Sequence, residues 1–520
     1  MTRLRYLGGA TPVVRHFNWI AAALVTLFAA YLHVLFFLNA GGLWRDEVDL
    51  VHLSLLPSLS EMWHKLPHDS CPILMHLVVR AWSAAGFGNA DPALRVLGLY
   101  VGLFLLVALW FASWAMRSGA PLLAVTLAGL NLTIIYAGDS LRGYGLGSAL
   151  AVLTLALIWR LACRPSLAAF CCTAAVAVLS VHALYQNAFL LFAACCGGFV
   201  LCAVERRWRD TLPIFAVGAA AAVSLLPYIP LLAGAHWYVI YKSGFLFSRG
   251  WQQLSEATGS PLTIFTWVWV AFWVGLIAAA IFVLLRRHDR VPEHARGLTL
   301  FAGTNLVLGV AGYAVFLKMS QYSTHMWNYV PLMVFSAVCL DTMFFTVWRW
   351  GRPAAMIFAA LTIPAAVVFD LPAMKCRQTN VDVIAARIAT EVAPNDYIIV
   401  YPFYCGTTFN RYYKGAASWT TLPPLEDYTL QRWDLFDAKI QTKDPIGPVI
   451  EHTISTLQSG NRVWFVGNPL VERSSFAWGA QVTQLLSTHS RLAAVVIDPS
   501  TNCVNPFENL PVFVATGWKP

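Results

Sequence analysis

Residues 18–50 have the sequence NWIAAALVTLFAAYLHVLFFLNAGGLWRDEVDL. Its first part, residues 18–39, is apolar and long enough to cross a hydrocarbon core of roughly 30 Å as a helix. A basic leader with Arg3, Arg5 and Arg15 precedes it, but the apolar part is too long for a signal-peptide core and no small-residue cleavage site precedes Trp44. We therefore expect a retained transmembrane helix that is followed at once by an acidic loop.

The whole chain has the composition of a membrane protein. Of its 520 residues, 58% are apolar and only 12% are charged, whereas about a quarter of the residues in soluble domains are charged. One water-soluble core cannot bury this much apolar surface, because cores stop growing near roughly 250 to 300 residues. A soluble enzyme, a disordered scaffold and a nucleic-acid-binding protein are all disfavoured, and the net charge of +9 has to be interpreted loop by loop.

We predict a polytopic α-helical membrane protein with about eleven spans, and twelve or thirteen as the alternative count. Lys and Arg concentrate in short cytoplasmic loops. With the N-terminus inside, the inner segments hold fifteen Lys and Arg residues and the short outer loops hold seven, so we expect a cytoplasmic N-terminus. The expected spans are 18–39, 93–116, 119–137, 143–162, 166–181, 185–204, 211–232, 262–285, 297–318, 329–348 and 353–372.

Residues 72–87, PILMHLVVRAWSAAGF, look like a further span, but they are short and carry His76 and Arg80 four residues apart on one helical face. A crossing here would invert every later loop and place the basic segment RRHDRVPEHARG outside. We therefore predict an interfacial helix on the outer surface. Residues 41–92 then form one long outer loop with interfacial helices.

The composition changes after Leu371, where residues 373–520 carry twelve basic and twelve acidic residues. Strand-like runs at 397–401, 462–467, 491–497 and 511–517 alternate with helical patterns at 380–392 and 475–487. This order predicts a soluble α/β domain over 373–520 after a transmembrane domain over 1–372, and an odd number of spans places that domain outside. A disulfide could join two of Cys376, Cys405 and Cys503 there, although the sequence does not give the pairing.

The first outer loop is acidic although the protein as a whole is basic. Asp46 and Glu47 follow directly on the first span, where a carboxylate pair could take a proton from an acceptor hydroxyl or hold a divalent metal ion. The alternative is a capping or solvated role. His68 and Asp69 could complete a metal site with Asp46, although a histidine near an interface is more often simply solvated.

A second acid, Asp139, lies with Arg142 in the short outer turn DSLRGYG. Polar groups at such a depth are costly unless they are paired or face water, so Asp139 either pairs locally, caps the next helix or acts in catalysis. Arg142 would suit a phosphate, because a guanidinium matches phosphate oxygens bidentately. Lys242, Arg249 and His325 in later outer loops would suit an anionic lipid head group, or would only anchor helix ends at the interface.

Five segments occur in an order that resembles a known family. They are WRDE (44–47), CPILMHLVVRAWSAAGFG (71–88), DPALRVLGLYVGLFLL (91–106), DSLRGYGL (139–146) and MWNYVPLMVFSAVCL (326–340). Together they look like the GT-C membrane glycosyltransferases, specifically the bacterial relatives of dolichyl-phosphate-mannose protein mannosyltransferases and of the lipid A aminoarabinose transferase. The resemblance implies that Asp46 is the catalytic base with Glu47 as its neighbour, that Asp139 is a second outer-loop acid, and that Asp69 lies near a position used for metal or donor binding.

The resemblance also implies transfer of a hexosyl or pentosyl group from a polyprenyl-phosphate donor to an acceptor at the outer face of the bacterial cytoplasmic (inner) membrane. A lipid phosphate is already a good leaving group, so no nucleotide cofactor would be needed. The enzyme would neutralise the departing phosphate and deprotonate the acceptor, and a single displacement would invert the anomeric configuration. We expect membrane lipids and the lipid-linked sugar as partners, but no nucleic acid.

The acceptor stays open among lipid, glycan and protein hydroxyls. A transporter or flippase of lipid-linked sugars is the main alternative, for which charged residues at mid-membrane or paired repeats would be expected. A non-catalytic envelope assembly protein is the second alternative.

Overall fold

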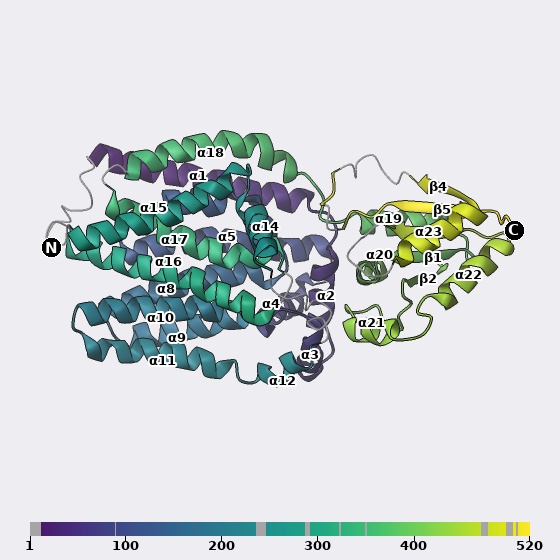
Figure 1. Ribbon diagram of the computed structural model, residues 1–520, viewed down its shortest axis with the longest axis horizontal. Helices are drawn as coiled ribbons and strands as arrows, with labels where there is room; N and C mark the ends of the chain where they lie inside the picture. The colour runs from purple at the N-terminus through teal and green to yellow at the C-terminus, as the bar shows by residue number, and fades with distance from the viewer. Residues whose placement is uncertain are drawn as a thin grey trace. The chain divides into compact units, whose positions relative to one another are not determined.

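The computed structural model describes residues 12–520 except 89, 236–245, 287–291, 322–323, 349–350, 470–476, 496–502 and 506–507. Contacts within it divide the chain into two compact units. The helical unit comprises the described residues of 1–37, 71–233 and 241–374, and the second unit comprises those of 38–70, 234–240 and 375–520. Figure 1 shows the long helices of the first unit and the sheet with its helices in the second.

Eight helices in the described part of the chain are long and apolar enough to cross a membrane, and each coincides with a predicted span. The chain is therefore a multi-pass membrane protein, as its composition predicts. Within the unit, α5 packs against α8 and α10 packs against α16. The eight are α1 (Pro12–Asn39), α5 (Asp91–Met116), α8 (Gly143–Cys163), α10 (Asn187–Val204), α15 (Ile264–Arg286), α16 (Glu293–Ser320), α17 (Val330–Val347) and α18 (Gly351–Ala373).

The other three predicted spans are short or broken. The 166–181 prediction corresponds to α9 (Leu167–Ala183), and the 211–232 prediction is divided into α11 (Thr211–Ser224) and α12 (Tyr228–Ala233). The 119–137 prediction is divided into α6 (Leu122–Ala124), the π-helical turn η3 (Val125–Gly129) and α7 (Leu132–Gly138).

A buried acid supports the broken 119–137 segment. The Asp341 carboxylate on α17 accepts hydrogen bonds from the backbone N–H groups of Leu123 and Ala124 at 2.8 and 3.1 Å. Amide groups at the start of a helix have no partner within that helix, and in a membrane they need one from another helix. Asp341 therefore has a structural role at the start of α6.

The segment 72–87 forms α4 (Ile73–Trp82), followed by the π-helical turn η2 (Ser83–Phe87). The positive φ of 97° at Gly86 interrupts the helix, so it stays shorter than a full span. α4 packs on α5, α8 and α9. Two further elements of this unit are α14 (Phe247–Thr258) and the 3₁₀ turn η6 (Met326–Tyr329).

In the residues that the structure describes, the second unit forms a five-stranded sheet in the order β2-β1-β3-β5-β4. β2, β1 and β3 are parallel, whereas β5 is antiparallel to both β3 and β4. Its strands are β1 (Tyr397–Tyr401), β2 (Ser418–Thr421), β3 (Val463–Gly467), β4 (Arg491–Val495) and β5 (Val512–Thr516). The helices of the C-terminal part are α19 (Val381–Glu391), α20 (Gly406–Tyr412), α21 (Trp433–Ile440), α22 (Gly447–Gln458) and α23 (Trp478–His489).

The core of this unit lies between the sheet and helices α19 and α20. Ile384 and Ile388 of α19 and Phe409 of α20 are fully buried against Ile398 and Val466 of the sheet. A disulfide joins Cys376 to Cys503, and Cys405 is a buried thiol. The unit also includes α2 (Arg45–Ser54) and α3 (Leu59–Lys65) of the first predicted outer loop, and α2 packs on α20.

Candidate active site

The three acids of the RDEVD sequence at the start of α2 have three different environments. Trp44 is extended and the helix begins at Arg45, so Asp46 and Glu47 occupy its first turn, where the helix dipole favours negative charge. Glu47 is fully buried and accepts a hydrogen bond from the Trp44 backbone N–H at 3.2 Å. Asp49 is also buried, and it accepts a hydrogen bond from the Gln431 backbone N–H at 2.7 Å.

Asp46 is the partly exposed acid of the three, with 19% of its side chain accessible. Its Oδ1 atom accepts hydrogen bonds from Arg45 Nε at 2.8 Å and from Gln431 Nε2 at 3.2 Å. The Arg45 guanidinium lies over the Tyr404 ring, 4.6 Å from its centroid. An ionised carboxylate held in this way can accept a proton from a hydroxyl group that reaches it.

Glu508 fixes the start of α2 from the C-terminal part of the chain. It accepts hydrogen bonds from the Arg45 backbone N–H at 3.2 Å and from the Thr408 hydroxyl at 2.7 Å. Burial raises the pKa of Glu508 to about 7, although the hydrogen bonds from Thr408 and Thr379 and the nearby Arg45 oppose that shift.

His68 and Asp69 do not complete a metal site with Asp46. Across the residues that the structure describes, no three His, Cys, Asp or Glu side chains gather as ligands for a metal ion. His68 Nδ1 instead lies 3.8 Å from an oxygen of Asp434. The predicted set of His68, Asp69 and Asp46 is therefore not assembled among the described residues, where Asp46 Oδ1 accepts from Arg45 and Gln431 instead.

Asp139 lies at the end of α7, in the helical unit, and forms a buried pair with His33 of α1. His33 Nδ1 and Asp139 Oδ1 are 2.6 Å apart, and both side chains are almost fully buried. Two glycines of α5 make room for them. A Cβ atom on Gly102 would overlap Asp139 Oδ1 and lie 2.6 Å from His33 Nδ1, and a Cβ atom on Gly98 would overlap the Asp139 carbonyl oxygen.

The predicted phosphate-binding residues of the helical unit lie on adjoining elements. Arg142 precedes the first residue of α8 and is 5% exposed, whereas Arg249 is exposed on α14. His325 precedes η6, and its ring stacks on Trp327 with centroids 4.5 Å apart. Lys242 lies outside the described residues.

Hydrogen bonds connect these elements. The Asn328 side chain of η6 donates to the Tyr144 hydroxyl of α8 at 3.4 Å, and the Tyr329 hydroxyl donates to the Gly250 carbonyl of α14 at 3.1 Å. The start of α8, η6 and α14 therefore adjoin one another.

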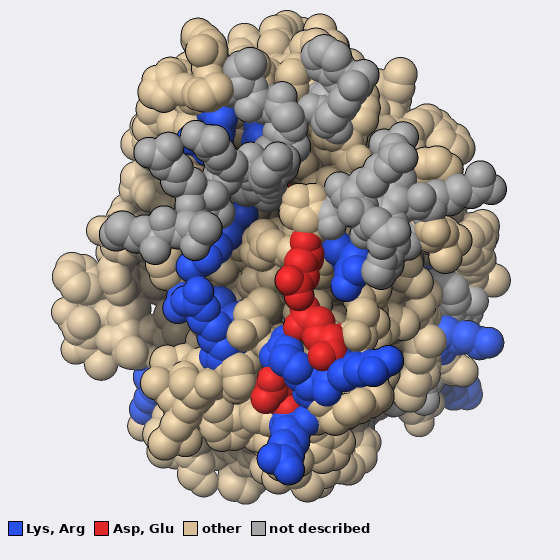
Figure 2. All heavy atoms as spheres, turned by 90° about the vertical axis from the view of Figure 1, so that its left-hand side faces the viewer, with Lys and Arg blue, Asp and Glu red and all other residues tan. Residues whose placement is uncertain are grey.

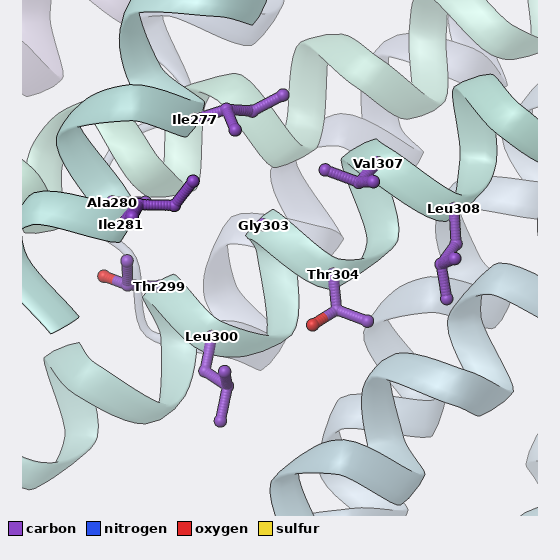
Figure 3. Close-up of a pocket in the computed structure, with 9 residues that line it drawn as sticks. All are labelled: Ile277, Ala280, Ile281, Thr299, Leu300, Gly303, Thr304, Val307 and Leu308. Carbon is purple, nitrogen blue, oxygen red and sulfur yellow. The ribbon is translucent and has the colours of Figure 1, made fainter. Parts of the chain in front are cut away.

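A hollow of about 330 Å³ lies between α15 and α16 (Figure 3). Its lining is aliphatic apart from Thr299 and Thr304, and it includes Ile277, Val307 and Leu308. Such a lining can hold a hydrocarbon chain, but it offers no charged side chain to a phosphate.

Sequence reasoning missed several of these residues. His33 was hidden in an apolar span, although an ionisable side chain inside a span is itself a sign of a buried partner. The spacing of Gly98 and Gly102 follows the small-xxx-small pattern of close helix packing. Gln431 and Glu508 gave no sequence signal, because their contacts with α2 join parts of the chain more than 380 residues apart.

Neither a protein-family model nor a curated protein sequence matches this chain. Among solved structures, ArnT from Cupriavidus metallidurans bound to undecaprenyl phosphate aligns with a TM-score of 0.50 and 15% identity, over 95% of this chain and 98% of that chain. The apo state of the same protein gives a TM-score of 0.50 and 13% identity over the same shares.

The Archaeoglobus fulgidus oligosaccharyltransferase, in complex with Zn and sulfate, aligns with a TM-score of 0.49 and 11% identity over 85% of this chain and 67% of that chain. Identities this low concern the fold alone. The alignment with ArnT, which extends over nearly the full length of both chains, agrees with the fold that the five sequence segments imply. The chain therefore has the GT-C fold of membrane glycosyltransferases.

Proposed function

We propose that this protein is a glycosyltransferase that moves a hexosyl or pentosyl group from a polyprenyl-phosphate donor to an acceptor hydroxyl at the outer face of the bacterial inner membrane. The observation that carries the proposal is the partly exposed Asp46 carboxylate at the start of α2, held by Arg45 and Gln431 in a chain of GT-C fold. The solved ArnT structure that shares this fold is bound to undecaprenyl phosphate, which supports a lipid-linked donor.

In this mechanism Asp46 is the general base. It accepts the proton of the acceptor hydroxyl as the oxygen attacks the anomeric carbon, the bond from that carbon to the phosphate oxygen breaks, and the lipid phosphate leaves with the electron pair. Attack opposite the leaving group inverts the anomeric configuration. We assign Arg142, Arg249, His325 and Lys242 to neutralise the developing phosphate charge. The buried His33–Asp139 pair would support the turn that carries Arg142.

The distribution of charge supports a cytoplasmic N-terminus and a C-terminal domain outside. Figure 2 shows the end of the helical bundle at which α1 begins, where Lys and Arg spread widely and Asp and Glu form a small central group. Loops at cytoplasmic helix ends carry such an excess of positive charge. Described arginines of the predicted inner loops include Arg117, Arg160, Arg164, Arg206, Arg207 and Arg209.

The test begins with the products. Mass spectrometry of envelope glycolipids and glycans with and without the protein should reveal one lost sugar addition, which identifies donor and acceptor. Purified protein in lipid nanodiscs is then assayed for transfer of that sugar from its undecaprenyl-phosphate form. Asp46→Asn should reduce transfer about 10²- to 10⁴-fold, the usual contribution of a general base, while binding of undecaprenyl phosphate persists.

Asp437→Asn, the same substitution on α21 of the same domain, serves as the matched control and should leave transfer intact. Full transfer by Asp46→Asn would refute the assignment of the base. The glycosyltransferase proposal would be refuted if the envelope glycolipids and glycans are the same with and without the protein and no undecaprenyl-phosphate hexose or pentose serves as donor. That result would favour the transporter or the assembly protein.

A further inference from the structure

One loop of the C-terminal domain, residues 427–434 including the first two residues of α21, contacts α2 at three successive positions of one helical face. The Gln431 side chain donates to Asp46 Oδ1 at 3.2 Å, and the Gln431 backbone N–H donates to Asp49 Oδ1 at 2.7 Å. One turn further, His52 Nδ1 donates to the Thr429 carbonyl at 2.7 Å. Since residues three apart on a helix are neighbours, the 427–434 loop follows the face of α2 that carries Asp46.

The 427–434 loop is itself held in one shape by internal ion pairs. Arg432 binds Asp427 at 2.6 Å and Asp434 at 2.7 Å, and Asp427 Oδ1 also accepts hydrogen bonds from the backbone N–H and the hydroxyl of Thr429. Burial alone would raise the pKa of Asp434, but the hydrogen bonds from Arg432 and the nearby His68 lower it to about 2. The ion pairs of Arg432 with Asp427 and Asp434 therefore stay charged over the physiological pH range.

The charged groups around Asp46 come from both parts of this unit. Arg45 binds the carboxylate directly and lies over Tyr404. Glu47 is turned to the Trp44 backbone N–H, and Glu508 to the Arg45 backbone N–H. The Gln431 amide is thus a neutral donor, on a rigid loop, directed at the same Asp46 oxygen that Arg45 binds.

We propose that Gln431 is a positioning residue that fixes the orientation of the Asp46 carboxylate, so that the C-terminal domain is a working part of the catalytic machinery. The inference rests on the proposed function in one respect only, that Asp46 is the base. A functional carboxylate needs support from neighbours whose own positions are locked, and Gln431 is locked by its backbone bond to Asp49. A base that is displaced by about 1 Å can lose on the order of 100-fold in rate.

Two variants of Gln431 distinguish a role in orienting the Asp46 carboxylate from a role in folding. Gln431→Met keeps the length of the side chain and the backbone N–H but removes the donor, and we expect the turnover number to fall at least tenfold while the KM for donor stays within twofold. Gln431→Glu places a second carboxylate against Asp46, and like charges disfavour the ionised form. The acid limb of the pH profile of transfer should therefore shift about one unit to higher pH.

The same shift can be measured without a sugar substrate. Carbodiimide modifies protonated carboxyl groups, so the pH dependence of labelling at Asp46, followed by peptide mass spectrometry on the full chain in nanodiscs, reports its protonation. Gln431→Glu should move the labelling midpoint of Asp46 about one unit upward. Gln441→Glu, which adds the same charge at the exposed end of α21, should leave the midpoint in place.

The inference is overturned if Gln431→Glu moves the labelling midpoint no further than Gln441→Glu does, or if Gln431→Met transfers sugar at the full rate. These outcomes differ from failure of the proposed function, in which Asp46→Asn itself remains active while the labelling midpoint still responds to Gln431→Glu. Circular dichroism and gel filtration of each variant verify that the fold is intact.

Discussion

Gly102→Ala should destabilise the helical unit although it adds a single methyl group. A Cβ atom at this position of α5 would overlap Asp139 Oδ1 and lie 2.6 Å from His33 Nδ1. Real Cβ atoms essentially never come within 3.0 Å of another heavy atom, so the buried pair would have to move. Both side chains are buried, with His33 1% and Asp139 2% exposed, so the core around them would have to accommodate the movement.

Three effects set the size of the change in unfolding free energy. Overpacking of a well-filled core costs about 1 to 3 kcal/mol, and leaving a buried hydrogen-bonding atom without its partner costs about 1 to 3 kcal/mol. Replacing glycine by alanine inside a helix returns up to about 1 kcal/mol. The steric and electrostatic costs outweigh the helical gain, so we expect a net loss of about 3 kcal/mol.

The assay is thermal unfolding of the purified protein in nanodiscs, followed by tryptophan fluorescence. Gly275→Ala is the matched control, since a Cβ atom there meets nothing within 4 Å, and it should be neutral or slightly stabilising. Combining Gly102→Ala with His33→Ala should cost less than the two single changes added together, because the shorter side chain at position 33 gives Asp139 room to move. Equal stability of Gly102→Ala and Gly275→Ala would refute the argument that the His33–Asp139 pair packs tightly against α5.

Two further predictions concern the second unit. Burial raises the pKa of Glu508 from 4.5 to about 7, so the folded unit retains a proton that the unfolded chain releases. The free energy of unfolding should therefore fall by about 3 kcal/mol as pH rises from 4.5 to 7. Hydrogen exchange of the Arg45 amide should accelerate over the same pH range, and a Glu508→Gln variant should lose most of this pH dependence. Reducing the Cys376–Cys503 disulfide, whose cysteines are 127 residues apart, should lower stability by about 5 kcal/mol. The measurement is a reductant-dependent melting temperature that is absent in Cys376→Ser/Cys503→Ser.

The helical unit could be predicted well because a membrane span has one dominant requirement. Each of the eight long helices coincides with a predicted apolar stretch. The prediction was less accurate where a proline or a partner from another helix determines where a helix ends. At 211–232, for example, Pro227 lies between α11 and α12. Hydropathy likewise cannot reveal that Asp341 of α17 satisfies the amides at the start of α6.

The C-terminal domain shows the same division between local and distant causes. Four predicted strands are confirmed as β1, β3, β4 and β5, because each is a run of apolar residues. β2 was missed because SWTT is short, lies at the edge of the sheet and is exposed at its first residue. Helices α20, α21 and α22 were also missed.

The acid pair at 46 and 47 shows why the candidate site needed the structure as well as the sequence. Consecutive residues of a helix point about 100° apart, so two neighbouring carboxylates cannot both face one substrate, whereas residues 46 and 49 share a face. The structure uses all three: Glu47 caps the helix, Asp49 holds the Gln431 backbone, and Asp46 stays partly exposed beside the Gln431 side chain. Helical periodicity alone could have placed Glu47 and Asp46 on different faces of α2. Only the hydrogen bond from the Gln431 side chain, 385 positions away in the sequence, distinguishes the role of Asp46 from that of Asp49.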